Sequence, residues 1–345
     1  MYNNIYKNKK VLVSGNTGFK GSFFADWLVS LEANVLGYSL FPNTNPNNFS
    51  FSKREYDTVF HDINDYNFLS ETLFNFKPEI VFHFAAQPIV SEAYSDPIST
   101  LNTNILGTAK LLDACRDIDS IKGIVVVTSD KCYYNNEKGV AFKVGDTLAG
   151  LDPYSVSKSC AELVVDSYRY AFLKDKLVAT VRAGNCIGGG DWAKNRIITD
   201  IVNAIRTKSV LNIRNIDSIR PWSSLWDLLN GYLMVGQKLL EGKTEFARAW
   251  NFGPRAGSKL FTIGDILKSF AKYWKAPEIN LIPNPIKEAN ILKLNSKETN
   301  EELGWLPALS QEEIFKWTVE WYKNFYENNK IITEEQFNLF KEKIK

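Results

Sequence analysis

Histidine is scarce in this chain of 345 residues, which holds only His61 and His83. Both lie inside apolar runs, and histidines in such runs are usually packed in the core with their hydrogen bonds satisfied. A metal centre takes several strong ligands, and a Ser-His-Asp triad needs a histidine beside its nucleophile. The sequence therefore argues against metal catalysis and against a serine hydrolase.

Cysteine is sparse as well, and Cys115, Cys132, Cys160 and Cys186 show no CxxC spacing. Scattered cysteines of this kind are typical of reduced thiols and not of a disulfide framework. Long apolar runs are also missing, since only VLV follows the N-terminal lysines before a glycine turn. That pattern fits neither a secretory signal nor a transmembrane span, so we expect a cytoplasmic protein with no membrane partner.

An excess of charge of either sign is missing too. The 41 basic and 39 acidic side chains leave a net charge of +2 that is spread along the chain, which argues against a nucleic-acid partner. By contrast, 45% of the residues are hydrophobic, enough for a large buried core.

Short apolar runs alternate with helical patterns through the first half of the chain. This alternation predicts an α/β fold with a Rossmann-type, doubly wound parallel sheet, in which ligands bind at the carboxyl ends of the strands. The runs cover 11–15, 34–40, 58–63, 80–86, 123–129 and 177–185, so Gly15, Asp62, Ala86, Ser129 and Asn185 would emerge at one edge.

The segment DPYSVSK at 152–158 carries a YxxxK pair at the start of a predicted helix. Asp152 can serve as the N-cap and Pro153 as the first helical residue, so Tyr154 and Lys158 fall one turn apart on the same face. An ammonium near a phenol favours the phenolate, which would make Tyr154 a usable base near neutral pH. This is the outline of dehydrogenase chemistry.

The segment GNTGFKG at 15–21 joins the first predicted strand to a helix. Glycines at Gly15, Gly18 and Gly21 would let the backbone approach a pyrophosphate, which the N–H groups of the helix N-terminus would bind. A purely structural glycine turn is the alternative interpretation.

The end of the second predicted strand bears on the choice of dinucleotide. An acidic residue there normally binds the adenosine ribose of NAD, but this position is Ser39 or Leu40. No arginine replaces it to hold a 2′-phosphate, so NAD is favoured over NADP. Lys20 is the nearby cation that would favour NADP.

These motifs suggest two parts. We predict an NAD-binding Rossmann domain over 1–185, with a returning segment at about 222–262 that contains AWNFGP. We predict a smaller C-terminal α/β substrate-binding lobe over 186–345, with a helix from Arg196 to Lys208 and a late helix that begins with a capping box of Ser310 and Glu313.

Several side chains have both a functional and a structural interpretation. Asp62 could bind the adenine amino group or cap the following turn. Asn104 could relay a water, fix backbone near the site, or be a surface helix residue. Two arginines could clamp a diphosphate or form surface salt bridges, and three tryptophans could stack on a base or fill the core. These are Arg196, Arg220, Trp192, Trp222 and Trp226.

Taken together, GNTGFKG, HFAAQPIV, VTSDKCY, DPYSVSKSCAELV, RAGNCIGGGDW and RPW resemble the extended short-chain dehydrogenase/reductases that act on nucleotide sugars. Within that family they are most similar to the 4,6-dehydratases, above all those acting on CDP-glucose. The resemblance runs from about Lys9 to Trp321. It implies bound NAD, a nucleotide-sugar substrate, transient oxidation at C4, loss of water across C5 and C6, and reduction at C6.

The resemblance also implies roles for individual side chains. Tyr154 would take the proton of the sugar 4-hydroxyl, with Lys158 holding the nicotinamide ribose and lowering the tyrosine pKa. Ser129 would hydrogen-bond O4, and Asp130 would protonate the departing 6-hydroxyl. Lys131 stands where related dehydratases have a glutamate as the C5 base, and could be that base or an electrostatic stabiliser of the enolate.

The remaining implied contacts are as follows. The cofactor would lie against Gly15, Thr17, Gly18, Phe19, Lys20, Gly21, Asp62, Ile63, Ala85, Ala86, Asn104, Thr128, Tyr154 and Lys158, and the substrate against Gln87, Asn185, Arg196 and Arg220. The chain departs from the family pattern at Lys143, where an arginine is expected, and at Ser223 and Ser224, where the pattern has Gln-His. These departures leave the nucleotide base and the exact sugar open.

Two other functions stay open. A nucleotide-sugar 4-epimerase shares the tyrosine, the lysine and NAD but needs no acid at Asp130, and a non-catalytic dinucleotide sensor needs only the glycine turn. The resemblance further implies a homodimer that pairs through the helices of Asn104 and Tyr154. An apolar stripe fits that pairing, although packing against the sheet explains it equally well. The stripe is Leu106, Leu111, Leu163 and Val164.

Overall fold

The computed structural model describes residues 1–255, 257–283 and 291–345, and the chain divides into two compact units. The first unit takes in Met1–Tyr134, Val144–Arg182 and Leu229–Asn251. The second takes in Asn135–Lys143, Ala183–Leu228 and Phe252–Lys345. The assignment of cofactor to the first part and substrate to the second stays a prediction.

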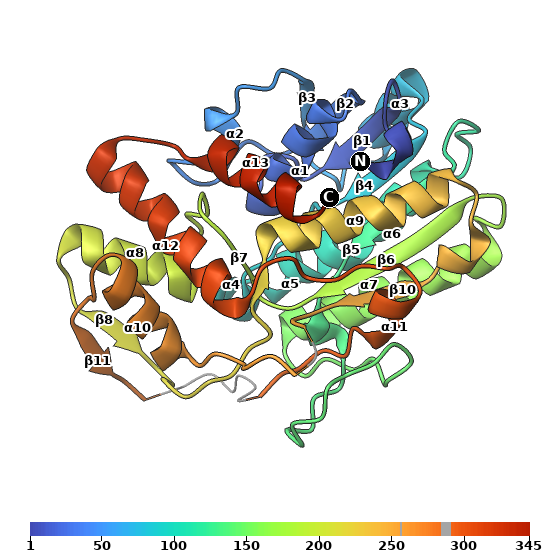
Figure 1. Cartoon of the computed structure of the whole chain (residues 1–345). Coiled ribbons are helices and arrows are strands. Elements are labelled where there is room, and N and C mark those ends of the chain that lie inside the picture. Colours follow the sequence, from blue (N-terminus) through green and yellow to red (C-terminus); the bar gives the residue numbers. More distant parts are fainter. Residues whose placement is uncertain (256, 284–290) are drawn as a thin grey trace. The chain divides into compact units, whose positions relative to one another are not determined.

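The first unit is built on a seven-stranded sheet with the order β10-β6-β5-β4-β1-β2-β3 (Figure 1). The strand pairs from β3 across to β6 are parallel. The strands are β1 (Lys10–Ser14), β2 (Asn34–Ser39), β3 (Asp57–Phe60), β4 (Ile80–His83), β5 (Gly123–Val127), β6 (Leu177–Ala183) and β10 (Ala249–Phe252). Each of them falls within or next to an apolar run of the sequence, so the predicted doubly wound α/β fold is confirmed.

Helices lie on both faces of this sheet, as the alternating sequence pattern requires. The helices of this unit are α1 (Phe19–Ser30), α2 (Asn48–Phe51), α3 (Tyr66–Phe76), α4 (Val90–Ser95), α5 (Pro97–Leu101), α6 (Gly107–Ala114), α7 (Pro153–Ala171) and most of α9 (Leu225–Leu240). Short helical turns are η1 (Tyr2–Asn4), η2 (Asn102–Leu106), η3 (Asp130–Cys132) and η4 (Thr244–Phe246).

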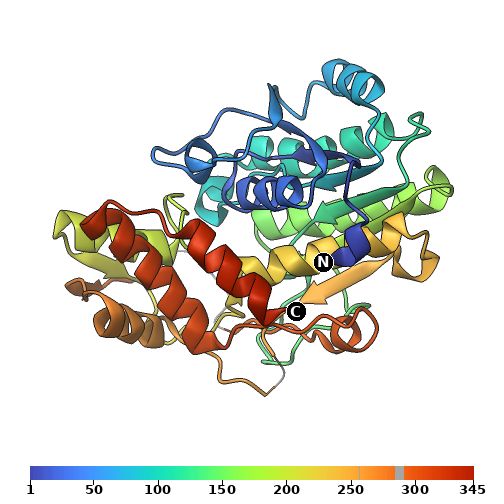
Figure 2. The same cartoon turned by 45° about the horizontal axis from the view of Figure 1, so that its top comes forward.

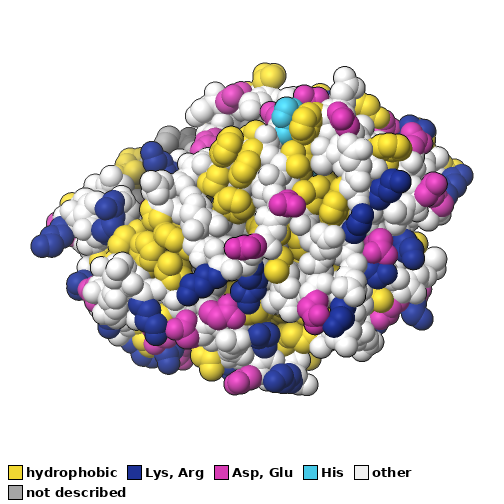
Figure 3. All heavy atoms as spheres, turned by 90° about the horizontal axis from the view of Figure 1, so that it is seen from above, with side chains coloured by type: hydrophobic (Ala, Val, Ile, Leu, Met, Phe, Trp, Pro, Cys, Tyr) yellow, Lys and Arg dark blue, Asp and Glu magenta, His cyan; other side chains and the backbone are white. Residues whose placement is uncertain are grey.

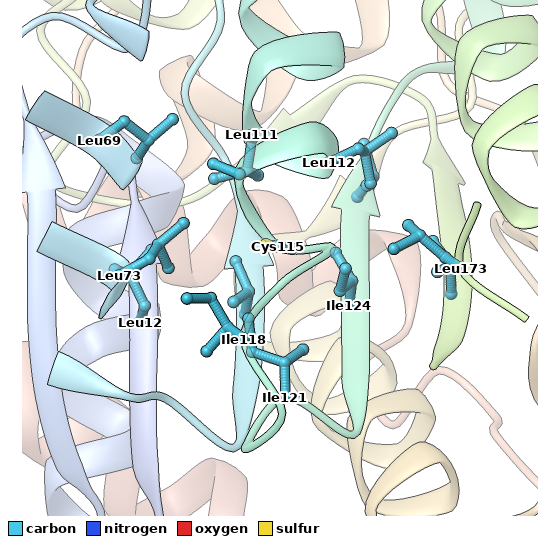
Figure 4. Close-up of a cluster of buried hydrophobic side chains, with 14 of the residues drawn as sticks. Leu12, Leu69, Leu73, Leu111, Leu112, Cys115, Ile118, Ile121, Ile124 and Leu173 are labelled. Carbon is cyan, nitrogen blue, oxygen red and sulfur yellow. The ribbon is translucent and has the colours of Figure 1, made fainter. Parts of the chain in front are cut away.

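One buried apolar cluster joins the sheet to the helices on one face (Figure 4). In Figure 4, Leu69 and Leu73 of α3 lie on the side of Leu12 of β1, and Leu112 of α6 lies on the side of Ile124 of β5. All five side chains are fully buried, so this cluster holds helices α3 and α6 against the sheet.

The second unit is mixed and smaller. Its strands are β7 (Cys186–Ile187), β8 (Leu211–Ile213), β9 (Ser223–Ser224) and β11 (Ile279–Leu281), and its helices are α8 (Ile197–Thr207), α10 (Ile263–Tyr273), α11 (Lys297–Glu301), α12 (Gln311–Asn328) and α13 (Thr333–Lys343). Helices α12 and α13 run side by side in opposite directions (Figures 1 and 2), and Lys343 reaches Glu313 at 2.9 Å. The predicted capping box of Ser310 and Glu313 begins α12, and the helix predicted from Arg196 is α8.

Candidate active site

The glycine turn after β1 has one position that the fold does not require to be glycine. Gly15 has φ +74°, and a Cβ there would lie 2.6 Å from the backbone nitrogen of Ala85. A Cβ on Gly21 would lie 2.1 Å from the carbonyl oxygen of Gly15. Gly18 is exposed, and its Cβ would meet only that oxygen, at an ordinary 3.4 Å. Packing therefore explains Gly15 and Gly21, whereas Gly18 leaves open space.

The start of α1 offers donors beside that space. Gly18 is the N-cap, and no side chain caps the first turn, which begins at Phe19 and Lys20. Uncapped N–H groups at a helix N-terminus are suited to bind an anion such as a pyrophosphate. The turn thus fits a dinucleotide.

The end of β2 is neutral, as the sequence indicated. The Thr17 hydroxyl lies 2.8 Å from the Ser39 hydroxyl and donates to the Leu40 carbonyl at 2.9 Å. Asp62 follows β3 and accepts hydrogen bonds from the backbone and side-chain nitrogens of Asn64 at 2.8 and 3.1 Å. Asp62 therefore caps a turn, and a contact with adenine stays a prediction. Its neighbour Ile63 is buried.

Helix α7 begins as the sequence predicts and places Tyr154 and Lys158 in its buried first turns. The Asp152 carboxylate accepts from the Ser155 backbone at 3.0 Å, and Pro153 occupies the first turn. Tyr154 is 8% and Lys158 is 5% exposed. Burial lowers the pKa of Lys158 to about 8, and the positive charge of Lys20 adds to the effect.

Asn104 fixes the backbone on both sides of the site. It lies in the π-helical turn η2 and is 1% exposed, so its interpretation as a surface helix residue was wrong. Its side chain accepts from the Gln87 backbone nitrogen at 2.8 Å and donates to the Gln87 carbonyl at 3.1 Å and to the Ser157 hydroxyl at 2.8 Å. The Ser157 hydroxyl donates to the Tyr154 carbonyl at 2.7 Å. Asn104 thereby joins the segment Ala85–Gln87 after β4 to the first turn of α7.

The segment after β5 holds the predicted acid in a tight turn. The Ser129 side chain caps η3, accepting from the Lys131 backbone nitrogen at 3.2 Å and donating to the Asp130 carboxylate at 3.0 Å. Ser129 and Asp130 are buried, while Lys131 is half-buried. A hydroxyl and a carboxyl group thus lie in contact in the same buried turn.

Sequence reasoning missed a buried charge beneath this turn. Glu162 is fully buried on α7, four residues after Lys158. It accepts hydrogen bonds from the Thr128 hydroxyl, from Thr180 at 2.8 Å and from Arg182 at 2.7 Å. The usable signal was an acidic residue on the helix face that carries Lys158, because such a residue needs a buried partner.

The two histidines differ from each other. His83 is buried, with its ring nitrogens 2.6 Å from the Ser14 hydroxyl and 3.1 Å from the Thr108 hydroxyl, as expected for a satisfied core histidine. Burial lowers its pKa to about 3. The same expectation for His61 was wrong, because His61 is a third exposed and pairs with Asp65 at 2.8 Å. The β3 strand ends at Phe60, before this histidine.

The predicted substrate residues of the second unit already have protein partners. Arg196 donates to Asp191 at 2.8 Å, and the buried Arg220 donates to the Ile219 carbonyl at 3.0 Å. The Asn185 carbonyl accepts from the Ser223 backbone at 2.9 Å. Each of the three tryptophans packs on another aromatic ring, and stacking on a base stays a prediction. Trp192 packs on Trp321, Trp222 on Phe315 and Trp226 on Phe337.

In the described part of the chain, no three His, Cys, Asp or Glu side chains gather as a metal site. No helix there has the length and apolar character needed to cross a membrane. On the face shown in Figure 3, basic side chains alternate with acidic ones, which matches the weak net charge of the sequence.

Known sequences place these features in a family. The sequence pattern of the GDP-mannose 4,6 dehydratase family matches residues 12–318. CDP-glucose 4,6-dehydratase of Salmonella typhimurium is 40% identical over 331 residues, which cover 93% of this chain and 92% of the relative. dTDP-glucose 4,6-dehydratase of Shigella flexneri is 25% identical, with 93% of this chain and 95% of the relative covered.

Solved structures share the fold. Epimerase Mth375 of Methanothermobacter thermautotrophicus superposes with a TM-score of 0.82 at 20% identity, covering 99% of this chain and 96% of that one. UDP-glucuronic acid 4-epimerase of Bacillus cereus, in complex with UDP-glucuronic acid and NAD, gives 0.79 at 21% identity and covers 92% of this chain and 100% of that one. Because the family pattern and the Salmonella relative both extend over most of the chain, this protein belongs to the GDP-mannose 4,6 dehydratase family of the extended short-chain dehydrogenase/reductases.

Proposed function

We propose that this protein is an NAD-dependent 4,6-dehydratase, a hydro-lyase that converts CDP-glucose to CDP-4-keto-6-deoxyglucose. The observation that supports the substrate is the 40% identity to a CDP-glucose 4,6-dehydratase over nearly the full length of both chains. The observation that supports the chemistry is the buried set of Ser129, Asp130, Tyr154 and Lys158 in the first unit.

NAD fits the glycine turn, because the open position at Gly18 and the uncapped start of α1 suit a pyrophosphate. Ser39 at the end of β2 is neutral, so neither a carboxylate for the ribose of NAD nor an arginine for the 2′-phosphate of NADP stands there. Lys20 is the residue to substitute if the protein is found to bind NADP. When bound, the cofactor supplies reversible two-electron oxidation, so that the sugar is oxidised at C4 and reduced at C6 with no net redox change.

The protein supplies the proton transfers. Tyr154 takes the proton of the 4-hydroxyl, and Lys158 holds the nicotinamide ribose and favours the phenolate. Ser129 donates a hydrogen bond to O4. The C4 ketone makes the C5 proton acidic, and Asp130 protonates the 6-hydroxyl as it departs. The C5 proton passes to a base, and the C6 hydroxyl leaves as water with the proton that Asp130 supplies. After reduction at C6 a proton returns to C5, so the net change is the loss of one water.

Lys131 occupies the position of the C5 base. We propose that it acts either as the base itself or as the charge that stabilises the enolate, and substitution separates the two roles. Lys131→Arg keeps a charge that does not deprotonate, so it retains turnover if charge is the function and loses it if proton removal is.

The 4-epimerase is the second candidate, since solved epimerases share this fold. Mass spectrometry of the product distinguishes them, because dehydration removes one water and epimerisation leaves the mass unchanged. The buried carboxyl group of Asp130 favours dehydration. A sensor role would be indicated if Tyr154→Phe left every activity unchanged.

The substrate is tested with CDP-, dTDP-, GDP- and UDP-glucose in parallel, with the absorbance of the 4-keto product in alkali as the readout. We expect CDP-glucose to have the highest kcat/KM. A higher kcat/KM with another nucleotide would contradict the choice of CDP-glucose, which the departures at Lys143, Ser223 and Ser224 leave open.

We also propose that the protein is a cytoplasmic homodimer that pairs through α5, η2 and α7. The predicted stripe separates in the structure: Leu111 is in the core and Val164 packs against it, whereas Leu106 and Leu163 are 51% and 55% exposed. Ile98 of α5 is 74% exposed, which adds to this outer apolar surface. Light scattering should give about twice the 39.2 kDa chain mass, and Leu163→Asp should give the monomer.

A further inference from the structure

A single buried ion pair in the first unit reaches both ends of the turn that holds Ser129 and Asp130. At the near end, Glu162 accepts a hydrogen bond from the hydroxyl of Thr128, the residue just before the turn. Its other carboxylate oxygen accepts from Arg182 at 2.7 Å. Glu162 and Arg182 are 0% and 4% exposed, so both charges lie in the interior.

Arg182 carries the contact to the far end of the turn. Its second guanidinium nitrogen donates to the Tyr133 hydroxyl at 2.8 Å, and its guanidinium lies 5.1 Å from the centre of the Tyr133 ring. The Tyr133 hydroxyl donates onward to Asn251 of β10 at 2.7 Å. Tyr133 directly follows η3, so the pair contacts the residues on either side of Ser129–Cys132. We call Glu162, Arg182, Thr180 and Tyr133 the clamp.

The clamp also connects this turn to the YxxxK helix. Glu162 lies on α7 one turn beyond Lys158, and the neighbouring Ser159 donates to the Cys132 carbonyl at 2.8 Å. Helix α7 therefore contacts the turn at Thr128 and at Cys132. Any shift of the turn along α7 would break hydrogen bonds at both points.

Stability alone does not account for such a cluster. A buried ion pair contributes little to the free energy of unfolding relative to apolar side chains of the same volume, because desolvation offsets the attraction between the charges. What the clamp provides is a fixed geometry, since a carboxylate and a guanidinium accept and donate in defined directions. Proton transfer depends steeply on such geometry.

We propose that Glu162 and Arg182 are positioning residues that hold Ser129 and Asp130 in register with Tyr154 and Lys158. This inference rests on the proposed function for the roles of those four residues. It adds that their relative placement is set by the clamp, and that the clamp acts on the rate of the chemical steps and not on cofactor binding.

The main test replaces the pair with apolar side chains of similar size, as Glu162→Leu with Arg182→Met, so that no charge is left buried alone. Displacement of catalytic groups by about 1 Å costs on the order of 100-fold in rate, so we expect kcat to fall by about that factor. We expect NAD affinity, measured by quenching of protein fluorescence, to stay within about twofold. Amide hydrogen exchange should accelerate in residues 128–133 and stay unchanged in the strands β1 and β2.

Milder variants keep the test decisive if the double variant does not fold. Thr180→Val removes one hydroxyl from Glu162 and retains both charges, and Thr180→Ser should restore the lost rate. Thr318→Val is the matched control, because Thr318 is as buried as Thr180 but donates to the Ile314 carbonyl of its own helix α12. We expect Thr180→Val to lower kcat severalfold and to accelerate exchange in 128–133, with neither change in Thr318→Val.

The outcomes separate the clamp from the function. If Tyr154→Phe abolishes turnover while Thr180→Val and the folded double variant keep wild-type kcat and wild-type exchange in 128–133, the positioning role is wrong and the proposed function stands. If Tyr154→Phe itself retains full turnover, the proposed function is wrong. Accelerated exchange in 128–133 in the clamp variants would still support the clamp's effect on the turn.

Discussion

The buried charge of Lys158 should lower the unfolding free energy of the cofactor-free protein, although catalysis needs this lysine. The lysine is 5% exposed, and burial lowers its pKa from 10.5 to about 8. Below pH 8 it is charged in both the folded and the unfolded chain, and the folded state bears the full cost of burying that charge. The shift corresponds to about 3 kcal/mol of unfolding free energy. Lys158→Met should therefore abolish turnover and stabilise the cofactor-free protein by up to about this amount at pH 7.

The sign of the pH dependence follows from the direction of the shift. Between pH 8 and 10.5 the unfolded chain binds the lysine proton more tightly than the folded chain, so wild-type stability rises with pH over that window. Lys158→Met lacks this rise. The difference in unfolding free energy between the two proteins should shrink by about 3 kcal/mol from pH 7 to about pH 10.

Urea denaturation followed by tryptophan fluorescence measures both quantities. Lys176→Met is the control, because Lys176 is as deeply buried but lies 3.0 Å from the Asp175 carboxylate, so its removal should lower stability at pH 7. A Lys158→Met protein that is no more stable than wild type at pH 7, or a difference that does not change with pH, would refute the reasoning.

Three further results are expected. Gly18→Ala should leave the unfolding free energy within about 0.5 kcal/mol of wild type and weaken NAD binding. Gly15→Ala should lower the unfolding free energy by more than about 1 kcal/mol, because its Cβ meets the Ala85 backbone. Urea denaturation and fluorescence titration with NAD would distinguish the two variants. Asn104→Leu should lower the unfolding free energy by about 2–4 kcal/mol, measured by urea denaturation, because three buried hydrogen bonds are lost. Burial lowers the pKa of His83 from 6.5 to about 3, so between these pH values the unfolded chain binds a proton that the folded chain does not. The unfolding free energy should therefore fall by up to roughly 5 kcal/mol as the pH falls from 6.5 to about 3. His83→Gln should lack this part of the pH dependence in urea denaturation.

The sequence predicted the elements whose signals are local. Strands appeared as short apolar runs, and α7 was marked by its N-cap Asp152 and by Pro153, each of which acts within one helical turn. The glycine turn was visible because Gly15 must adopt a positive φ. These local signals were enough to find the fold and the Tyr154 and Lys158 pair.

The contacts between distant segments could not be read in the same way. Glu162 and Arg182 are 20 residues apart, and their pairing depends on α7 lying beside β6, which no short motif states. The sequence left Asn104 open between a surface position and a role in the site, because its partners Gln87 and Ser157 are distant in the chain. His61 followed an apolar strand but lies past its end, where the sheet no longer covers it.

Incubation of the purified protein with CDP-glucose, followed by mass spectrometry of the nucleotide sugar, tests the central claim most directly. Dehydration across C5 and C6 predicts a product lighter by one water that carries a 4-keto group, with Tyr154→Phe giving no product. A product of unchanged mass, or the same product from Tyr154→Phe, would contradict the account.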